Sequence, residues 1–449
     1  MKDFITQTSD LICGYPLFIV LIGGGLFLFF YSRMVPFRYF GRSIEALRAK
    51  DSGEGEGGQI TSWQALCSAV AATIGMGNIA GVAIALSIGG PGAIFWMWVS
   101  TVVGMATKFF EGTLASMYRG RDSEGNLQGG PMYMIVEGLG KNWRPLALFF
   151  SAFGCIGTLC LMQPNQLVEA IDTIFLVPRG IEPTFWLHLA MGVVITVITA
   201  IVVLGGIERI AAMASKLVPL MIVMYFLLVG YILILNYAAI PSVFASIFEG
   251  AFSMKAGIGG IIGIALLGAR RAALINEAGT GTASMMHGSS RNSEPVREGF
   301  VAMIAPLTDS GLVCTLTSLA ILSTGYTAGE GMKGLQIAID AFEKAIPGVG
   351  QYLLLAILFI FAFSTMFSYS YYGMKCTSFL FGAKYGKYYN YFYLVLLIVA
   401  SVMSLPTVVG IIDMAYAFMA FPTMYTLLRL APKAKAALAK YIEENPKRK

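Results

Sequence analysis

The chain has 449 residues, of which 57% are hydrophobic and only 12% are charged, and its net charge is +6. Soluble domains carry about 25% charged residues, so this composition, with a mean hydropathy of +0.72, excludes a soluble protein. Several apolar runs reach the roughly 20 residues that cross a bilayer. The six cysteines form no CxxC pair and the two histidines lie far apart, so we expect neither a disulfide framework nor a metal cluster. The first apolar run lacks the features of a cleavable signal peptide.

The apolar runs predict an all-α polytopic membrane protein with about eleven transmembrane helices. In chain order the spans are expected near 15–31, 62–88, 93–117, 146–162, 184–204, 213–235, 242–273, 300–322, 352–378, 391–405 and 408–430. With the N-terminus outside, the inner connections and the tail hold about 25 of the 31 lysines and arginines. This positive-inside pattern predicts a multi-pass protein with an outer N-terminus and a cytoplasmic C-terminus. The positive charge therefore indicates membrane orientation rather than nucleic-acid binding.

Two of the spans are interrupted by glycines. The second holds a glycine-rich stretch at 73–78, and the seventh holds one at 255–260 after a short half-helix at 242–254. Such stretches either let helices pack closely or break a helix, which turns free amides toward an anion and free carbonyls toward a cation. Because five spans separate the two interruptions, we predict two inverted five-helix repeats. The expected units are an N-terminal helix with a basic cytoplasmic connection at 1–61, repeats at 62–236 and 237–430, and a basic tail at 431–449.

Four motifs resemble the alanine or glycine:cation symporter family. They are Gly89-Gly90-Pro91-Gly92-Ala93-Ile94-Phe95-Trp96-Met97-Trp98 continued to Gly104, Gln128-Gly129-Gly130-Pro131-Met132-Tyr133, Asn276-Glu277-Ala278-Gly279 and Ser370-Tyr371-Tyr372-Gly373. The resemblance covers about residues 15–430. It implies a sodium-coupled symporter of a small neutral amino acid, alanine or glycine, with leucine-transporter-like inverted repeats. One departure is Tyr369, where the family often has tryptophan, and this leaves the volume of the pocket open.

A zwitterionic substrate needs donors for its carboxylate, acceptors for its ammonium group and a pocket for its side chain. In the second span we expect the Thr73 hydroxyl and the backbone amides to donate, although threonine also commonly bonds its own helix. The side-chain amides that close the fourth span bond either the substrate or the backbone. The glycines of the seventh span let its backbone approach the substrate, and span nine supplies apolar walls. The residues expected to contact substrate are Thr73, Gly75, Met76, Gly77, Gln163, Asn165, Gly259, Gly260, Met366 and Tyr369.

Sodium, the coupling ion that the resemblance implies, takes oxygen ligands as other hard cations do. Helix breakage would free carbonyls in the second span, while Asn78 either caps the second half-helix or ligates the cation. Span nine carries a Ser/Thr cluster that shares one face, and in the resembling architecture this helix flanks the site. The residues expected at sodium are Ala71, Ile74, Asn78, Ser364, Thr365 and Ser368.

Charged residues at membrane depth are functional candidates. We expect Lys108 and Glu111 to neutralise one another, whereas Asp309 and Asp413 have no nearby partner in the sequence. A second group, Arg270, Arg271 and Glu277, is expected toward the inner end of span seven, at a gate.

The sequence does not indicate an enzyme, because it holds neither a Walker-type loop nor a Ser/His/Asp or Cys/His set. No organic cofactor is expected. The partners expected are a small amino acid and the bilayer of a prokaryotic cytoplasmic membrane, with no nucleic acid and with the oligomeric state left open. The alternatives to a sodium symporter are a proton-coupled carrier and, more remotely, a channel or an intramembrane protease.

Overall fold

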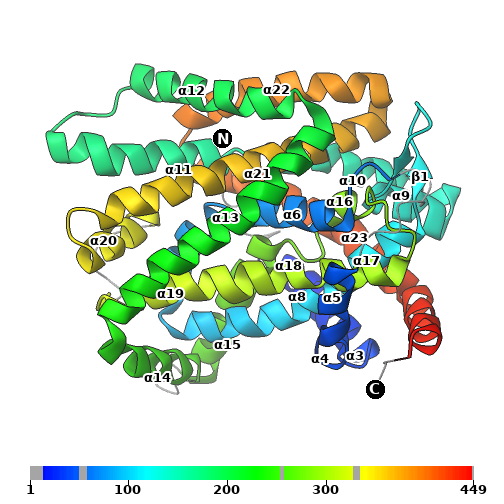
Figure 1. The fold of residues 1–449 in the computed structure, drawn as a ribbon, viewed down its shortest axis with the longest axis horizontal. Coiled ribbons are helices and arrows are strands. Elements are labelled where there is room, and N and C mark those ends of the chain that lie inside the picture. The colour runs from blue at the N-terminus through cyan, green and yellow to red at the C-terminus, as the bar shows by residue number, and fades with distance from the viewer. Residues whose placement is uncertain (1–13, 50–57, 253–256, 327–333, 447–449) are drawn as a thin grey trace.

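The computed structural model describes residues 14–49, 58–252, 257–326 and 334–446, and nearly all of these residues are helical (Figure 1). A first apolar element, α2 (Tyr15–Phe18), η1 (Ile19–Gly23) and α3 (Gly24–Tyr31), is followed by the short helices α4 (Val35–Arg38) and α5 (Phe40–Arg48). The strands β1 (Gly120–Arg121) and β2 (Leu127–Gln128) form one antiparallel hairpin after the third apolar helix.

The remaining elements fall into two runs of helices. The first run is α6 (Ser62–Thr73), η2 (Gly77–Gly81), α7 (Val82–Gly89), α8 (Gly92–Met117), α9 (Pro131–Tyr133), η3 (Met134–Leu139), η4 (Lys141–Trp143), α10 (Arg144–Gly157), α11 (Met162–Ile171), η5 (Asp172–Leu176), η6 (Val177–Arg179), α12 (Phe185–Val203) and α13 (Gly206–Leu235). The second is η7 (Tyr237–Ala239), α14 (Ile240–Ala251), α15 (Gly257–Asn276), α16 (Thr282–His287), α17 (Pro295–Ala302), α18 (Ile304–Pro306), η9 (Leu307–Val313), α19 (Cys314–Ser323), α20 (Leu335–Ala345), α21 (Gly350–Phe381), α22 (Ala383–Val402) and α23 (Leu405–Glu444).

The described residues form an integral membrane fold. Eight helices are long and apolar enough to cross a bilayer, and a bent pair makes a ninth. The two other predicted spans coincide with the shorter apolar element Tyr15–Tyr31 and with α22, neither of which is among these nine. The count of eleven and the two-repeat layout therefore stay predictions. The expected tail at 431–449 is helical as far as Glu444, as a continuation of α23, and residues 447–449 lie outside the described part.

The predicted interruption of the second span is present. Thr61 and Gln64 form a reciprocal capping box at the start of α6, an arrangement that satisfies two free amides at a helix N-terminus. The helix ends at Thr73, and its second half begins at Gly77 after a bend of 54°. Residues 74–76 thus supply non-helical backbone in the middle of the span.

The seventh-span break predicted at 255–260 is described only in part. Residues 255–256 lie outside the described part of the chain, between α14, which ends at Ala251, and α15, which begins at Gly257 and runs without interruption through Gly259 and Gly260. Within the described residues a break lies at 277–281, where Glu277, Gly279 and Gly281 have positive φ values of 53°, 91° and 88°. Glycine costs only about 1 kcal/mol inside a helix, so its presence alone does not place a break. The left-handed dihedrals at 279 and 281 are what favour glycine here.

The fourth span is longer than predicted. Helix α10 ends at Gly157, a kink over 158–161 with Cys160 at φ 55° follows, and α11 and η5 carry the span on to Leu176. The residues expected at its far end therefore lie near its middle.

The helices pack in two groups on either side of the broken spans. In one, α8 packs against α15 and α17; in the other, α21 packs against α10 and α22, and α22 packs against α12. Helix α6 packs with the first group through α16 and α17, which also contact α8, and it meets α21 of the second group; α6 and α21 both lie at the centre of Figure 1. Elements at the two ends of the bundle are well separated, with α14 and α20 at the left of the view and the β1–β2 hairpin and α9 at the right. The site lies where α6 meets α21.

Candidate binding site at the helix breaks

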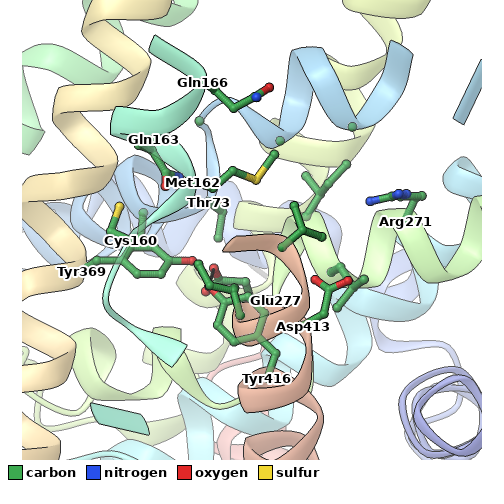
Figure 2. Close-up of a pocket in the computed structure, with 18 of the residues that line it drawn as sticks. Thr73, Cys160, Met162, Gln163, Gln166, Arg271, Glu277, Tyr369, Asp413 and Tyr416 are labelled. Atoms are coloured by element: carbon green, nitrogen blue, oxygen red, sulfur yellow. Dashed lines mark hydrogen bonds between the residues drawn. The ribbon is translucent and has the colours of Figure 1, made fainter. Parts of the chain in front are cut away.

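A cavity of about 120 Å³ lies between the two broken spans. Its walls come from α6 and the break after it, the α10–α11 kink, α15, α21 and the first turns of α23 (Figure 2). The lining residues are Ala72, Thr73, Gly75, Gly77, Gly81, Ile84, Cys160, Met162, Gln163, Gln166, Arg271, Leu274, Ile275, Glu277, Tyr369, Leu405, Val409, Ile412, Asp413 and Tyr416. Five of the residues expected to contact the substrate line this cavity, namely Thr73, Gly75, Gly77, Gln163 and Tyr369.

The cavity contains a carboxylate that the sequence analysis did not assign to the substrate site. Glu277 lies in the break between α15 and α16, where its carboxylate accepts hydrogen bonds from the hydroxyls of Thr282 and, at 3.1 Å, Tyr416. The Tyr416 hydroxyl also contacts that of Tyr369, and Figure 2 shows these three side chains converging below Thr73. Glu277 was expected near an inner gate because span seven was taken to end close to it. The chain continues past this break into α16, and Glu277 lines the cavity.

The backbone of the second-span break is held by Asn78. Its side-chain oxygen accepts a 2.9 Å hydrogen bond from the Gly75 amide. In an unbroken helix that amide would bond the carbonyl of Ala71, four residues earlier. Asn78 therefore caps the break and leaves the Ala71 carbonyl free.

The freed carbonyls meet the Ser/Thr cluster of α21. The Thr365 hydroxyl oxygen lies 3.0 Å from the carbonyl oxygen of Ala71, 3.2 Å from that of Ile74 and 2.9 Å from that of Phe361. One hydroxyl proton can serve only one of these acceptors at a time. The group is thus rich in oxygen lone pairs and poor in protons, which is the donor set a hard cation prefers.

The other two hydroxyls of this cluster are differently placed. Ser364 donates to the Phe361 carbonyl at 3.0 Å and lies 3.7 Å from the Met221 sulfur. The Ser368 hydroxyl is buried and has no hydrogen-bond partner among the described residues. It lies on the next turn of α21 below Thr365.

Several residues expected to contact the substrate lie elsewhere. Asn165 donates to the carbonyls of Ala400 and Met403 at 3.1 and 2.7 Å, so it ties α11 to the end of α22. Met366 is buried beside Thr199 and Tyr393. Neither residue lines the cavity, and nor do Met76, Gly259 and Gly260. Gly259 is exposed, with open space where a side chain would be.

A buried ion pair holds the seventh-span break. The ammonium group of Lys108 lies 3.3 Å from the Glu111 carboxylate, as predicted, and both side chains are 1% exposed. Lys108 also donates to the Glu277 carbonyl at 2.9 Å, while Glu111 accepts from the Gly279 amide at 2.6 Å. One turn of α8 thereby binds two backbone groups within the break.

Two further acidic residues flank the site. Asp309, in η9, accepts from the Asn78 side chain through one oxygen, and its other oxygen has no hydrogen-bond partner among the described residues. Asp413 lines the cavity at the end formed by α15 and the start of α23, 4.0 Å from Arg270. Arg271 also lines the cavity, so both arginines lie toward this end of it.

The opposite end of the bundle is sealed by a denser set of contacts. Backbone hydrogen bonds of 3.0 and 2.7 Å join residues 59–60 to residues 289–291. The buried Glu298 carboxylate accepts from Ser62 at 2.8 Å and contacts His287 at 2.7 Å. The start of α6 is thereby fixed to α16 and α17.

Comparisons with known proteins agree on one family. The model of the sodium:alanine symporter family matches residues 1–449. The sodium/alanine symporter AgcS of Methanococcus maripaludis is 35% identical over 438 residues, which cover 96% of this chain and 94% of its own. The amino-acid carrier protein AlsT of Bacillus subtilis is 34% identical over 453 residues, which cover 100% of this chain and 93% of its own.

The fold also occurs in a solved structure. The crystal structure of MhsT in complex with L-phenylalanine matches with a TM-score of 0.52 at 14% identity, covering 87% of this chain and 100% of that one. At this identity the likeness concerns the fold alone.

Proposed function

The chain belongs to the sodium:alanine symporter family and is a secondary transporter of amino acids rather than an enzyme, and from this premise we propose that it carries a small neutral amino acid, alanine or glycine, together with sodium. AgcS bears the name of a sodium/alanine symporter. The proposal places the protein in the cytoplasmic membrane with its N-terminus outside, as the positive-inside pattern predicts.

The oxygen cluster around Thr365 is the observation that carries the sodium proposal. Sodium would bind the carbonyl oxygens of Ala71 and Ile74 and the Thr365 hydroxyl. The hydroxyl oxygen lies 3.0 Å from the Ala71 carbonyl oxygen and 3.2 Å from that of Ile74. Ser364 and Ser368 lie on adjacent turns, and the unpartnered Ser368 hydroxyl is a further candidate ligand. The ion would link α6 to α21, which belong to different packing groups. Asn78 would act indirectly, by holding Gly75 away from the Ala71 carbonyl.

The cavity offers groups for both ends of a zwitterion. The start of the second half-helix, at Gly77, carries the positive end of a helix dipole and would attract the substrate carboxylate. Gln163 and Thr73 are close enough to add donors, since both line the same cavity. The Glu277 carboxylate, across the cavity, would accept the ammonium group. The Tyr369 and Tyr416 rings would limit the side chain to a small one.

The test is uptake of labelled alanine and glycine into proteoliposomes that hold the purified protein, with and without an inward sodium gradient at matched pH. We expect saturable uptake only with sodium. Thr365→Ala should raise the sodium concentration for half-maximal uptake by at least about tenfold, because it removes a ligand that interacts with a charge. Thr377→Ala is the matched control: Thr377 also lies on α21 and bonds its own helix at 2.9 Å, but it does not contact α6. Equal sodium dependence in both variants would contradict the proposed ion site.

Proton coupling is the second candidate, and Asp309 is the observation that favours it. A buried carboxylate with one unpartnered oxygen can hold a proton there, and it touches the site through Asn78. Asp309→Asn separates the two candidates. A sodium-coupled carrier should retain sodium-dependent uptake in this variant, whereas a proton-coupled carrier should lose uptake driven by an inward pH gradient.

A further inference from the structure

A second cavity of about 120 Å³ lies at the sealed end of the bundle, away from the helix breaks. It is equal in volume to the cavity at the breaks, so a solute that fits one is of a size to fit the other. Its walls are the β1–β2 hairpin, α9, the last turns of α21 and the start of α22. The lining residues are Gln59, Asp122, Glu124, Asn126, Gln128, Tyr133, Ile207, Tyr371, Met374, Lys375, Ser378, Ala383 and Lys387. We call it the inner cavity.

Lys375 gives the inner cavity a buried positive charge. The residue is 4% exposed, and its ammonium group donates to the Met285 carbonyl at 3.3 Å and to the Ser289 hydroxyl. It also lies 5.0 Å from the centre of the Tyr371 ring. In the described part of the chain no carboxylate lies within 4 Å of it. A buried cation held only by neutral groups is costly, and such a residue within a membrane span is a candidate for binding an anion.

The acidic groups of the inner cavity do not neutralise Lys375. The Asp122 carboxylate accepts the amides of Glu124 and Asn126, each at 2.9 Å, and the Gln128 side chain at 2.8 Å, so it is engaged in the hairpin. Glu124 lies 3.8 Å from Lys387 at the exposed rim. By contrast, the side-chain oxygen of Gln128 is buried and has no partner among the described residues. The inner cavity thus holds a buried cation whose hydrogen bonds go only to neutral groups, two carboxylates that are engaged by the hairpin and by Lys387, and a side-chain oxygen without a donor.

The partners of Lys375 belong to elements that alternating access would move. Met285 and Ser289 lie on α16 and just after it, in the group that contains α6 and α8, whereas Lys375 lies on α21 in the other group. If the two groups separate at this end to release substrate, Lys375 loses both hydrogen bonds. Its ammonium group then becomes available on the path that the substrate follows out of the site.

We propose that the inner cavity is a second binding site for the transported amino acid, in which Lys375 holds the carboxylate and Gln128 accepts a hydrogen bond from the ammonium group. This inference rests on the proposed function. Burial raises the pKa of Tyr133, an effect that Asp122 and Cys376 increase, so its phenol stays neutral at physiological pH. The substrate enters this site when the inner end opens. The Lys375 ammonium group then loses its hydrogen bonds to the Ser289 hydroxyl and the Met285 carbonyl and binds the substrate carboxylate. A neutral residue in its place removes a charged hydrogen bond from the inner site and leaves the outer approach unchanged.

The experiment compares the two faces of the full-length protein. Labelled alanine uptake is measured in right-side-out and in inverted membrane vesicles, for the wild type, Lys375→Met, Lys375→Arg and Lys384→Met. We expect Lys375→Met to raise the half-saturating alanine concentration about tenfold in inverted vesicles and less than twofold in right-side-out vesicles. Lys375→Arg should restore most of the affinity. Lys384→Met, which removes an exposed side chain of α22 that does not line the inner cavity, should leave both faces unchanged.

The other outcomes overturn the inference. If Lys375 only latches the sealed end, its loss favours the open state, and the affinity at the inner face rises while that at the outer face falls. If Lys375→Met changes the half-saturating alanine concentration equally at both faces, or at neither face, an inner site is also excluded. Gln128→Met is an independent variant that should raise the half-saturating alanine concentration in inverted vesicles about threefold to fivefold. An unchanged concentration would contradict Gln128 as the acceptor. A wild type that transports no amino acid refutes the proposed function itself, which distinguishes that failure from the failure of the inner site.

Discussion

At the scale of single residues, similar side chains differ in what surrounds them. Ser364, Thr365 and Ser368 lie on one face of α21, yet only Thr365 reaches the free carbonyls of α6. Its access depends on Gly75, because a Cβ atom there would lie 2.7 Å from the Thr365 hydroxyl and 3.3 Å from the Gln163 amide nitrogen. The smallness of Gly75 therefore serves the close approach of two helices as well as the break.

Gly75→Ala should accordingly impair sodium-dependent uptake without unfolding the protein. The added methyl group displaces the Thr365 hydroxyl, and we expect the half-saturating sodium concentration to rise by at least about tenfold. Gly230→Ala is the control, since a Cβ atom there meets nothing within 4 Å. The measurement is alanine uptake over a range of sodium concentrations, and a normal sodium dependence in Gly75→Ala would argue against the site.

Glu277 carries the second prediction at this scale. Glu277→Gln keeps the shape of the side chain but removes the charge proposed to face the substrate ammonium. We expect the half-saturating alanine concentration to rise about tenfold or more, because a charged hydrogen bond is replaced by a neutral one. Glu249→Gln, on α14, serves as control. A value for Glu277→Gln within twofold of the wild type would exclude Glu277 as the ammonium acceptor.

Sequence reasoning reached some of these residues and missed others for identifiable reasons. The pairing of Ala71 and Ile74 with Thr365 could be anticipated, because a glycine-interrupted span frees carbonyls at a known offset. Glu277 was misplaced because its role depends on where the span ends in space. Asn165 was overinterpreted, since a buried amide satisfies backbone carbonyls as readily as a ligand, and only the positions of Ala400 and Met403 decide between them.

At the scale of elements, breaks are stabilised by neighbouring helices. The seventh-span break has a few local hydrogen bonds, from the Ala278 amide to the Asn276 side chain and from Thr280 to the Glu277 carbonyl, and α8 adds two more through Lys108 and Glu111. The sequence contained both the ion pair and the glycines at 279 and 281. It gave no sign that the pair binds this break, because the two segments lie about 170 residues apart in the chain. Glycines at 259 and 260, which stand in a regular helix, were the more conspicuous signal.

Breaking this ion pair should destabilise the protein more than removing it. Glu111→Gln leaves the Lys108 charge buried without a carboxylate, and removing one partner of a buried pair costs roughly 3–5 kcal/mol. The double variant Lys108→Met/Glu111→Leu leaves no buried charge, and we expect its melting temperature to lie above that of Glu111→Gln. Both should transport poorly because the break is no longer held. Thermal unfolding in detergent provides the measurement, with Glu45→Gln as a control in a pair whose carboxylate is 62% exposed. A double variant less stable than the single one would contradict this account.

At the scale of the whole molecule, the two ends of the bundle are closed unequally. The all-α membrane fold and the family could be predicted from apolar runs and motifs, and both are confirmed. Which end of the bundle is closed could not be predicted from the sequence, because closure depends on contacts between segments that are distant in the chain. The cavity at the breaks extends to the end where Arg270 and Asp413 lie 4.0 Å apart. The other end is closed by the contacts of Glu298 and of residues 59–60 with 289–291, and it is the end that the proposed orientation places inside.

Weakening the sealed end should shift the balance between the two states. Glu298→Gln loses the charged contact with His287 and weakens that with Ser62, whose distances are 2.7 and 2.8 Å. The reporters are two single-cysteine variants in a background in which all six native cysteines are replaced: Val409→Cys in the cavity at the breaks and Met374→Cys in the inner cavity. A membrane-impermeant thiol reagent should label Val409→Cys more slowly from outside once Glu298→Gln is present, and Met374→Cys faster from inside. Asp340→Asn, in an exposed pair with Lys344, should change neither rate.

A ligand or mutation shifts only states that it distinguishes, so the two labelling rates must change in opposite directions. Changes in the same direction would mean that Glu298 supports the fold rather than the seal.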